Sequence, residues 1–194
     1  SHFVEKGSIL DKEAFKRCTS VYFPGSVYPM LPPVLSNGLC SLNGGEDRLA
    51  LTCEMTIDFA GNVIDRRIVK SIINNDYAMT YKVVQAILDG DEKLKTQYSK
   101  VYGMICDAYD LSRILNDKRQ KRGSINFETK ECKVILDDKG NVSEIKPYPY
   151  LVSNSIIEEF MLAANETVAE FICGLELPFV YRTHEEHNGE KMIA

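Results

Sequence analysis

The amino-acid sequence predicts an α+β fold, in which hairpins of mixed or antiparallel sheet pack on a buried central helix with further helices at its flanks. Two pairs of strand-like runs are each joined by a short turn, at residues 48–73 and 132–148. Helical patterns lie between and after these pairs, without strict alternation of strand and helix. The chain has 194 residues, of which 44% are hydrophobic, so we expect one globular unit over residues 1–194.

The first segments combine a short helix with a long stretch rich in proline and glycine. Residues 11–18 fit a helix with Asp11 as its N-cap. Residues 19–51 contain four prolines and four glycines but remain apolar. We therefore expect a long, irregular and ordered path along the domain surface. Its predicted anchors are Met30, Leu31, Leu35, Leu39 and Leu42.

The clearest strand is residues 48–59, where apolar and polar residues alternate and predict one buried and one wet face. The predicted buried set is Leu49, Leu51, Cys53, Met55, Ile57 and Phe59. The turn at residues 60–62 leads into a second run, so an antiparallel hairpin is expected. A similar hairpin is expected around residues 138–141.

Three helices follow from apolar periodicity and capping residues. Thr80 begins the first, and Gly90 ends it. Residues 91–122 predict one long amphipathic helix of roughly 45 Å. The third runs from Ser155 to Gly174, with Ser155 and Glu158 as a capping box, and its largely apolar circumference predicts a buried central position.

Composition narrows the function classes. No apolar run is long enough to cross a membrane and the first residues lack a signal-peptide pattern, so a soluble, cytoplasmic protein is expected. The six scattered cysteines suit buried, reduced thiols better than disulfides. A net charge of −5 argues against a nucleic-acid coat protein but allows a local basic groove.

Several short motifs leave alternatives open. The two histidines of "HEEH" at residues 184–187 are typical either of a solvated loop or of a zinc site. The cationic residues within 118–122 are typical either of a helix C-terminus or of a patch that contacts phosphates. The aromatic residues Tyr22, Tyr81 and Phe127 can either fill the edge of a core or stack on nucleic-acid bases. Patterns of phosphate-binding loops, dinucleotide folds, serine hydrolases and zinc proteases are absent.

Longer motifs carry a family resemblance. The segment "SHFVEKGSILDKEAFKRCTSVYFPGSVYPMLPPVLSNGLCSLNGGEDRLALTCEM", together with "GSINFET" and "SIIEEFMLAANETVAEFI", resembles the RNB catalytic domain of the ribonuclease II and ribonuclease R family. The patterns "GSxLDxEA", "PMLPxxLSNxLCSLN" and "EEFMLxANE" are the most specific, and the ribonuclease R branch fits best. The resemblance covers essentially the whole chain.

This resemblance implies a processive 3′ to 5′ exoribonuclease that uses Mg²⁺ to hydrolyse single-stranded RNA to nucleoside 5′-monophosphates. It implies that Tyr22 contacts nucleotides along the RNA path and that Phe127 stacks on terminal bases. Tyr81 and Glu158 are implied to contact RNA near its 3′ end and to favour ribose, because the 2′-hydroxyl can donate and accept hydrogen bonds. Glu158 could alternatively serve only as a helix cap.

Two motifs of the family are not found in these residues. The aspartate cluster that holds the metal is expected upstream of Ser1, and the arginine that assists cleavage is expected downstream. We therefore expect the chain to be a partial domain that contains no catalytic residue and no metal ligand. The chain alone is expected not to hydrolyse RNA. The rival hypothesis is a non-catalytic module with an RNB-like body that binds RNA or protein. A third hypothesis is a protein whose function depends on its cysteine thiols or on a bound metal ion.

Overall fold

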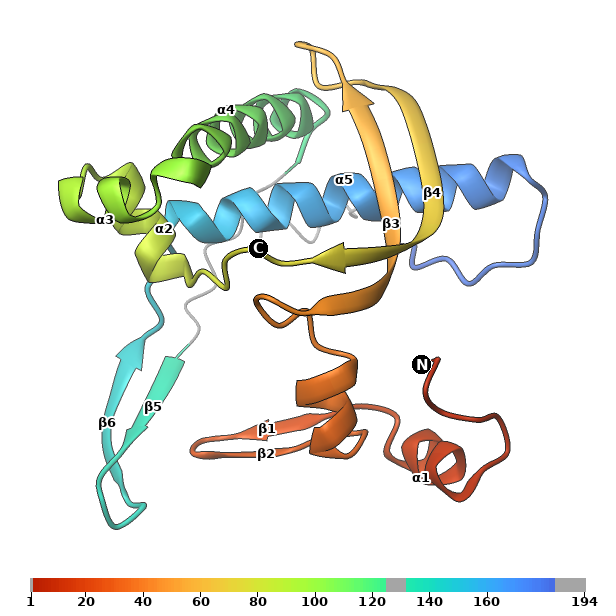
Figure 1. The fold of residues 1–194 in the computed structure, drawn as a ribbon, viewed down its shortest axis with the longest axis vertical. Coiled ribbons are helices and arrows are strands. Elements are labelled where there is room, and N and C mark those ends of the chain that lie inside the picture. Colours follow the sequence, from red (N-terminus) through yellow and green to blue (C-terminus); the bar gives the residue numbers. More distant parts are fainter. Residues whose placement is uncertain (1, 125–131, 184–194) are drawn as a thin grey trace, which may run out of the picture.

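A computed structural model describes residues 2–124 and 132–183, and its helices and strands confirm the α+β class (Figure 1). The elements in chain order are α1 (Ile9–Arg17), β1 (Val21–Phe23), β2 (Ser26–Tyr28), the π-helix η1 (Val34–Leu39), β3 (Asp47–Ile57), β4 (Val63–Asn74), α2 (Tyr81–Leu88), α3 (Glu92–Gln97), α4 (Ser99–Lys121), β5 (Cys132–Leu136), β6 (Val142–Pro147) and α5 (Val152–Gly174). Helix α5 runs through the body, with α4 beside it and β3–β4 crossing it (Figure 1).

The strands of the described residues form three separate antiparallel hairpins, β1–β2, β3–β4 and β5–β6. Both hairpins predicted from the sequence are confirmed. The predicted antiparallel sheet consists, in the described residues, of separate two-stranded hairpins. Each strand pairs with its neighbour in sequence, and helices and loops separate the pairs.

Helix α1 begins earlier than predicted. Ser8 is its N-cap: the Ser8 backbone is extended, and its Oγ accepts a hydrogen bond from the Asp11 backbone N–H at 3.1 Å. Asp11 lies inside the first turn, where its carboxylate accepts from the Gly7 backbone N–H at 2.8 Å. The prediction of Asp11 as N-cap is therefore wrong, because Ser8 and Asp11 together satisfy the free N–H groups.

The stretch predicted as irregular contains the β1–β2 hairpin and the π-helix η1. Leu35 is buried, with 8% exposure, and Met30 and Leu31 are half-buried. The predicted anchors Leu39 and Leu42 are wrong in the described structure, since they are 46% and 51% exposed. The π-helix directs Leu35 inward while the residues that follow it turn toward solvent.

The β3–β4 hairpin is covered over only part of its length. Thr167 of α5 donates a hydrogen bond to the sulfur of Met55 at 3.2 Å, so α5 covers the end of β3 that lies near the turn. Beyond this crossing, the predicted core residues Leu49 and Leu51 are 53% and 72% exposed, and Phe59 in the turn is 98% exposed. Exposure alternates along β3, but over residues 47–52 the less exposed side chains are Arg48, Ala50 and Thr52, so the predicted buried face is wrong there. Burial of Phe59 is also wrong.

The helical region between the hairpins follows the predicted pattern with one break. Thr80 caps α2 as expected, since its Oγ1 accepts from the Val83 backbone N–H at 3.3 Å. The long helix predicted over residues 91–122 is wrong as a single helix, because Tyr98 leaves helical geometry with φ −104° and ψ 27°. The Tyr98 ring contacts Tyr77 edge to face at 5.6 Å, a tertiary contact that the periodicity alone does not reveal.

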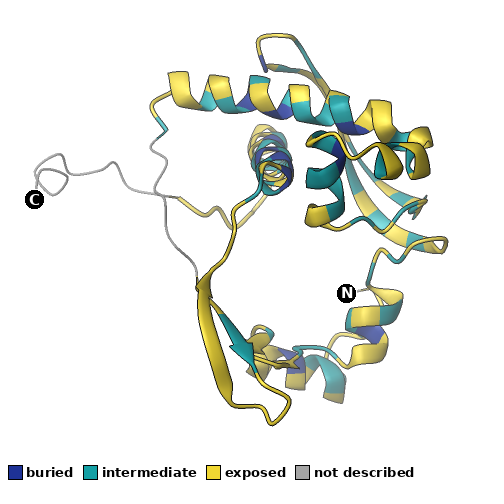
Figure 2. Cartoon of the chain, turned by 90° about the vertical axis from the view of Figure 1, so that its left-hand side faces the viewer, coloured by how far each residue is buried: buried dark blue, intermediate teal, exposed yellow. Residues whose placement is uncertain are grey.

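Helix α5 begins three residues before its predicted start. The Leu151 backbone N–H donates to the Asn154 side chain at 3.1 Å, so the predicted capping box of Ser155 and Glu158 is wrong. The helix is central but buried on one side only (Figure 2). Its buried residues are Ser153, Ile156, Glu159 and Thr167, whereas Ile157 and Met161 are more than half exposed.

All six cysteines are free thiols, as expected. Burial was expected as well and is wrong for Cys18, Cys40, Cys132 and Cys173, which are exposed. No helix among the described residues has both the length and the apolar character needed to cross a lipid bilayer.

Candidate functional site at the start of helix α5

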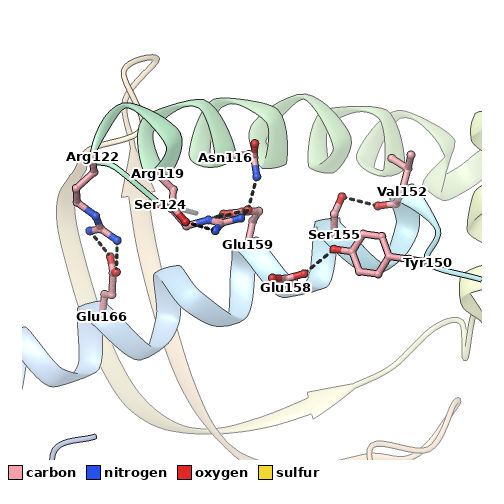
Figure 3. A network of polar contacts seen from close by, with 10 residues as sticks. All are labelled: Asn116, Arg119, Arg122, Ser124, Tyr150, Val152, Ser155, Glu158, Glu159 and Glu166. Atoms are coloured by element: carbon pink, nitrogen blue, oxygen red, sulfur yellow. Dashed lines mark hydrogen bonds and ion pairs between the residues drawn. The ribbon is translucent and has the colours of Figure 1, made fainter. Parts of the chain in front are cut away.

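Two adjacent glutamates on α5 have different surroundings. Glu159 points toward α4 and Glu158 points away from it (Figure 3). Neighbouring residues of a helix project about 100° apart, so only one of the pair can face the α4–α5 interface. The two carboxylates can therefore have different roles.

Glu159 is a buried structural carboxylate. Its side chain is 4% exposed and accepts hydrogen bonds from Asn116 Nδ2 at 2.7 Å and from Arg119 Nη2 at 2.7 Å and Nε at 3.1 Å. Ser124 Oγ accepts a further hydrogen bond from Arg119 Nη1 at 2.6 Å. The hydrogen bonds that Arg119 donates to the Glu159 carboxylate raise the pKa of Arg119 above its ordinary value. This network joins α4 to α5.

Glu158 is half-buried and accepts a hydrogen bond from the phenol of Tyr150, with 2.5 Å between Tyr150 Oη and Glu158 Oε2 (Figure 3). Partial burial of the phenol and this hydrogen bond raise the pKa of Tyr150 to about 12. The phenol is therefore protonated at neutral pH and acts as the donor. Glu158 thus presents a partly accessible carboxylate beside the α5 N-terminus.

The start of α5 is attached to α2. Ser153, which is 2% exposed, donates from Oγ to the Tyr81 carbonyl oxygen at 2.8 Å, and its backbone N–H donates to Gln85 Oε1 at 3.2 Å. The Tyr81 side chain is 42% exposed. The structure therefore brings together the helix starts that carry the predicted RNA-contacting residues Tyr81 and Glu158.

A cleft of about 240 Å³ lies further along, between α4, α5 and the β3–β4 turn. Cations and carboxylates both line it. Arg122 and Glu166 of the lining pair with each other at 2.7 Å, and Glu170 of the lining pairs with Arg66 of β4, outside the cleft lining, at 3.0 Å. Lys118 Nζ donates to the Gly61 carbonyl oxygen at 2.9 Å. The cationic run of residues 118–122 thus holds the fold together through Lys118, Arg119 and Arg122.

Tyr22 lies on a different part of the molecule. It is 77% exposed on β1, opposite Val27 of β2, while Phe23 and Tyr28 make an edge-to-face contact at 5.8 Å. The turn of this hairpin lies against β5, because a Cβ added at Gly25 would lie 2.9 Å from Leu136 Cδ1. The predicted residue Phe127 and the "HEEH" motif at residues 184–187 lie outside the described residues.

The residues that complete this site were not identified from the sequence. Arg119 and Tyr150 approach the two glutamates from positions 40 and 8 residues away. One available signal was the spacing of Ile156, Glu159 and Thr167, which places Glu159 on the buried side of α5. A buried carboxylate requires a partner, so a search for an arginine on a facing helix could have found Arg119.

The described residues do not by themselves fit a magnesium site. Within residues 2–124 and 132–183, no three side chains of histidine, cysteine, aspartate or glutamate gather closely enough to hold a metal ion. The acidic pairs at residues 46–47, 137–138 and 158–159 lie on separate elements. Asp137 serves its own turn, where hydrogen bonds from Asn141 lower the pKa of Asp137.

Comparison with known proteins identifies the family. The family model described as "RNB domain" matches residues 1–194. The chain belongs to the RNB family.

Its relatives within the RNB family include enzymes named Ribonuclease R. The chain is 46% identical over 194 residues to Ribonuclease R of Thermotoga maritima and 42% identical over 193 residues to that of Mycoplasmopsis pulmonis. All of this chain is covered in both comparisons, but only 27% and 26% of the relatives. The chain therefore spans about a quarter of the length of these RNB proteins, and the resemblance to the ribonuclease R branch is confirmed.

Two solved structures share the fold. The structure described as Mycoplasma genitalium RNase R in complex with ribose methylated single-stranded RNA matches with a TM-score of 0.85 and 30% identity, over 99% of this chain and 30% of that one. Yeast Ssd1, described as a pseudonuclease, matches with a TM-score of 0.63 and 20% identity, over 87% of this chain and 20% of that one. The second likeness concerns the fold alone.

Proposed function

We propose that this chain is the RNA-contacting part of the catalytic domain of a cytoplasmic, magnesium-dependent 3′ to 5′ exoribonuclease that processively releases nucleoside 5′-monophosphates. The observation that carries the proposal is membership of the RNB family over residues 1–194, together with 46% identity to a Ribonuclease R. The similar structure of Mycoplasma genitalium RNase R in complex with ribose methylated single-stranded RNA supports RNA as the ligand class.

In this proposal the chain contributes side chains that hold RNA. Tyr22 contacts nucleotides along the RNA path, and Phe127 stacks on the terminal bases, a sequence-tolerant interaction worth about 1–3 kcal/mol per base. Tyr81 contacts the RNA near its 3′ end and helps to favour ribose. The high exposure of Tyr22 supports such a role. Glu158, rather than Glu159, is the carboxylate proposed to meet the ribose, because Glu159 is buried and bound to Arg119.

The proposed enzyme uses Mg²⁺ held by acidic residues outside those described, which would activate water for phosphodiester hydrolysis. The described residues would bind and orient the RNA, exclude water around the bases and present a hydrogen-bond acceptor to the 2′-hydroxyl. The chain as printed is proposed to lack hydrolytic activity.

The test compares the full-length protein with the chain as printed on single-stranded RNA labelled at its 5′ end, with Mg²⁺ and with EDTA. The expected result is stepwise shortening from the 3′ end by the full-length protein, release of nucleoside 5′-monophosphates, and loss of both with EDTA. Endonucleolytic products, or activity unaffected by EDTA, would refute the proposed reaction.

A non-catalytic RNB-like module remains the second candidate, because the fold is shared with a protein described as a pseudonuclease. In that case the full-length protein binds RNA or a protein without degrading RNA. RNA binding by filter retention, combined with the nuclease assay, separates the two candidates.

A further inference from the structure

We propose that Tyr150 is a positioning residue that fixes the carboxylate of Glu158 for recognition of the ribose 2′-hydroxyl, and so contributes to discrimination between RNA and DNA. This inference rests on the proposed function, since it requires that Glu158 meet the ribose. It adds a residue outside the motifs that carry the family resemblance. Three features of the described residues around the start of α5 support this role.

The first feature is a short hydrogen bond from a phenol to a carboxylate. The phenol of Tyr150 lies 2.5 Å from Glu158 Oε2, within the range of charge-assisted O–H···O⁻ hydrogen bonds. A glutamate side chain has three rotatable bonds, and this contact restricts them. Glu158 Oε1 is not part of the contact, so an oxygen with a fixed direction remains to accept from a ligand hydroxyl.

The second feature is the anchoring of Tyr150 itself. Tyr150 directly precedes Leu151, whose backbone N–H is held by the Asn154 side chain at 3.1 Å. Two residues further on, Ser153 is bonded to Tyr81 and Gln85 of α2. The backbone that carries the phenol is therefore tied to two helices, although Tyr150 itself is 68% exposed.

The third feature is the division between the two adjacent carboxylates. Arg119 and Asn116 hold Glu159 inside the α4–α5 interface, and this fixes the rotation of α5 about its axis. Glu158 is consequently directed toward Tyr150 and away from α4 (Figure 3). A carboxylate that is fixed before the ligand arrives loses less conformational entropy on binding than a freely rotating one.

The experiment measures equilibrium binding of the full-length protein to a single-stranded RNA and to the DNA of the same sequence, with EDTA present to prevent hydrolysis. The variants are Tyr150→Phe, Glu158→Gln and the double variant. We expect Tyr150→Phe to weaken RNA binding about three- to tenfold, the range of one partly exposed charge-assisted hydrogen bond, and to leave DNA binding unchanged. In the Glu158→Gln background, Tyr150→Phe is expected to have no further effect, because the two residues act as one unit.

The matched control is Tyr148→Phe, which removes the phenol of another tyrosine in the same segment, one that is 48% exposed. This variant is expected to bind RNA and DNA as the parent does. A second measurement is independent of RNA: ultraviolet titration of Tyr150 is expected to show a lower phenol pKa in Glu158→Gln than in the parent, because the hydrogen bond from the phenol to the carboxylate raises it.

Each outcome has a definite meaning. Equal losses for RNA and DNA in Tyr150→Phe would assign the tyrosine to general structure and overturn the proposal. Unchanged or tighter RNA binding by Tyr150→Phe would show that the phenol does not assist Glu158 in binding RNA, and would also overturn the proposal. If the parent protein binds no RNA, the proposed function is refuted together with this inference. If the parent binds RNA and Tyr150→Phe has the same affinity, this inference alone is refuted.

Discussion

The Arg119–Glu159 pair gives the sharpest test of how the structure is held together. The perturbation is Arg119→Met, which keeps most of the side-chain volume but removes the guanidinium from Glu159. The buried Glu159 carboxylate then keeps its hydrogen bond from Asn116. Removing one member of a buried ion pair typically costs about 3–5 kcal/mol in the free energy of unfolding. An unpaired carboxylate can instead take up a proton, which for an ordinary glutamic acid at pH 7 costs roughly 4 kcal/mol.

We therefore expect Arg119→Met to lower the free energy of unfolding by about 3 kcal/mol at pH 7, since Asn116 still donates one hydrogen bond. At pH 5 protonation of a glutamic acid costs only about 1 kcal/mol, so the loss in Arg119→Met should shrink to about that value. The control is Arg122→Met, because Arg122 also joins α4 to α5 but its pair with Glu166 is 60% and 52% exposed. Exposed pairs contribute about 0.2–1 kcal/mol.

The assay is hydrogen exchange of the α4 and α5 backbone amides in the full-length protein, which reports local opening free energies even where global unfolding is not two-state. Urea unfolding of the same variants provides the global comparison. Burial would not determine the strength of the Arg119–Glu159 pair if Arg119→Met and Arg122→Met gave the same loss within about 0.5 kcal/mol, or if the loss in Arg119→Met did not depend on pH.

Three further predictions concern the proposed RNA-contacting aromatic residues Tyr22 and Phe127, the turn residue Gly25, and the phenol of Tyr150. Tyr22→Ala, and likewise Phe127→Ala, should weaken binding of single-stranded RNA by about 1–3 kcal/mol in fluorescence anisotropy while leaving thermal stability nearly unchanged; the reverse pattern would assign either side chain to packing. Gly25→Ala should destabilise the β1–β2 hairpin by about 1 kcal/mol, because Gly25 has φ +76° and a Cβ there would meet Leu136, and faster hydrogen exchange limited to β1–β2 and β5 would confirm it. Since the pKa of Tyr150 is raised to about 12 in the folded protein, its contribution to stability should be complete below about pH 10 and lost as the pH rises through 12; urea unfolding from pH 9 to about 12, with Tyr150→Phe as reference, measures this.

Local signals predicted the elements well where capping and periodicity act within a few residues. Thr80 caps α2, and the turn between β3 and β4 lies where expected, because both depend on neighbouring residues. The failures arise from contacts between distant parts of the chain. Tyr98 leaves the helix where its ring contacts Tyr77, and Leu49 remains exposed because α5 crosses only the other end of β3.

The candidate site was predicted only in part, for a similar reason. Motif resemblance pointed to Glu158, but the sequence alone could not separate a helix cap from a ligand contact. The structure gives the cap to Asn154 and pairs Glu158 with Tyr150. The buried role of Glu159 depends on Arg119, 40 residues away on another helix, and no local pattern reports such a pairing.

The separation of α4 and α5 along the chain also matters during synthesis. Helix α4 ends at Lys121, and α5, which packs against it, ends at Gly174. The face of α4 that carries Ile105 and Leu115 therefore cannot be buried against α5 until α5 has been synthesised. At a synthesis rate of about 5–20 residues per second, these apolar side chains remain without their α5 contacts for roughly 3–10 s on the ribosome. The nascent chain therefore passes through a stage at which chaperone binding, or aggregation, competes directly with helix docking.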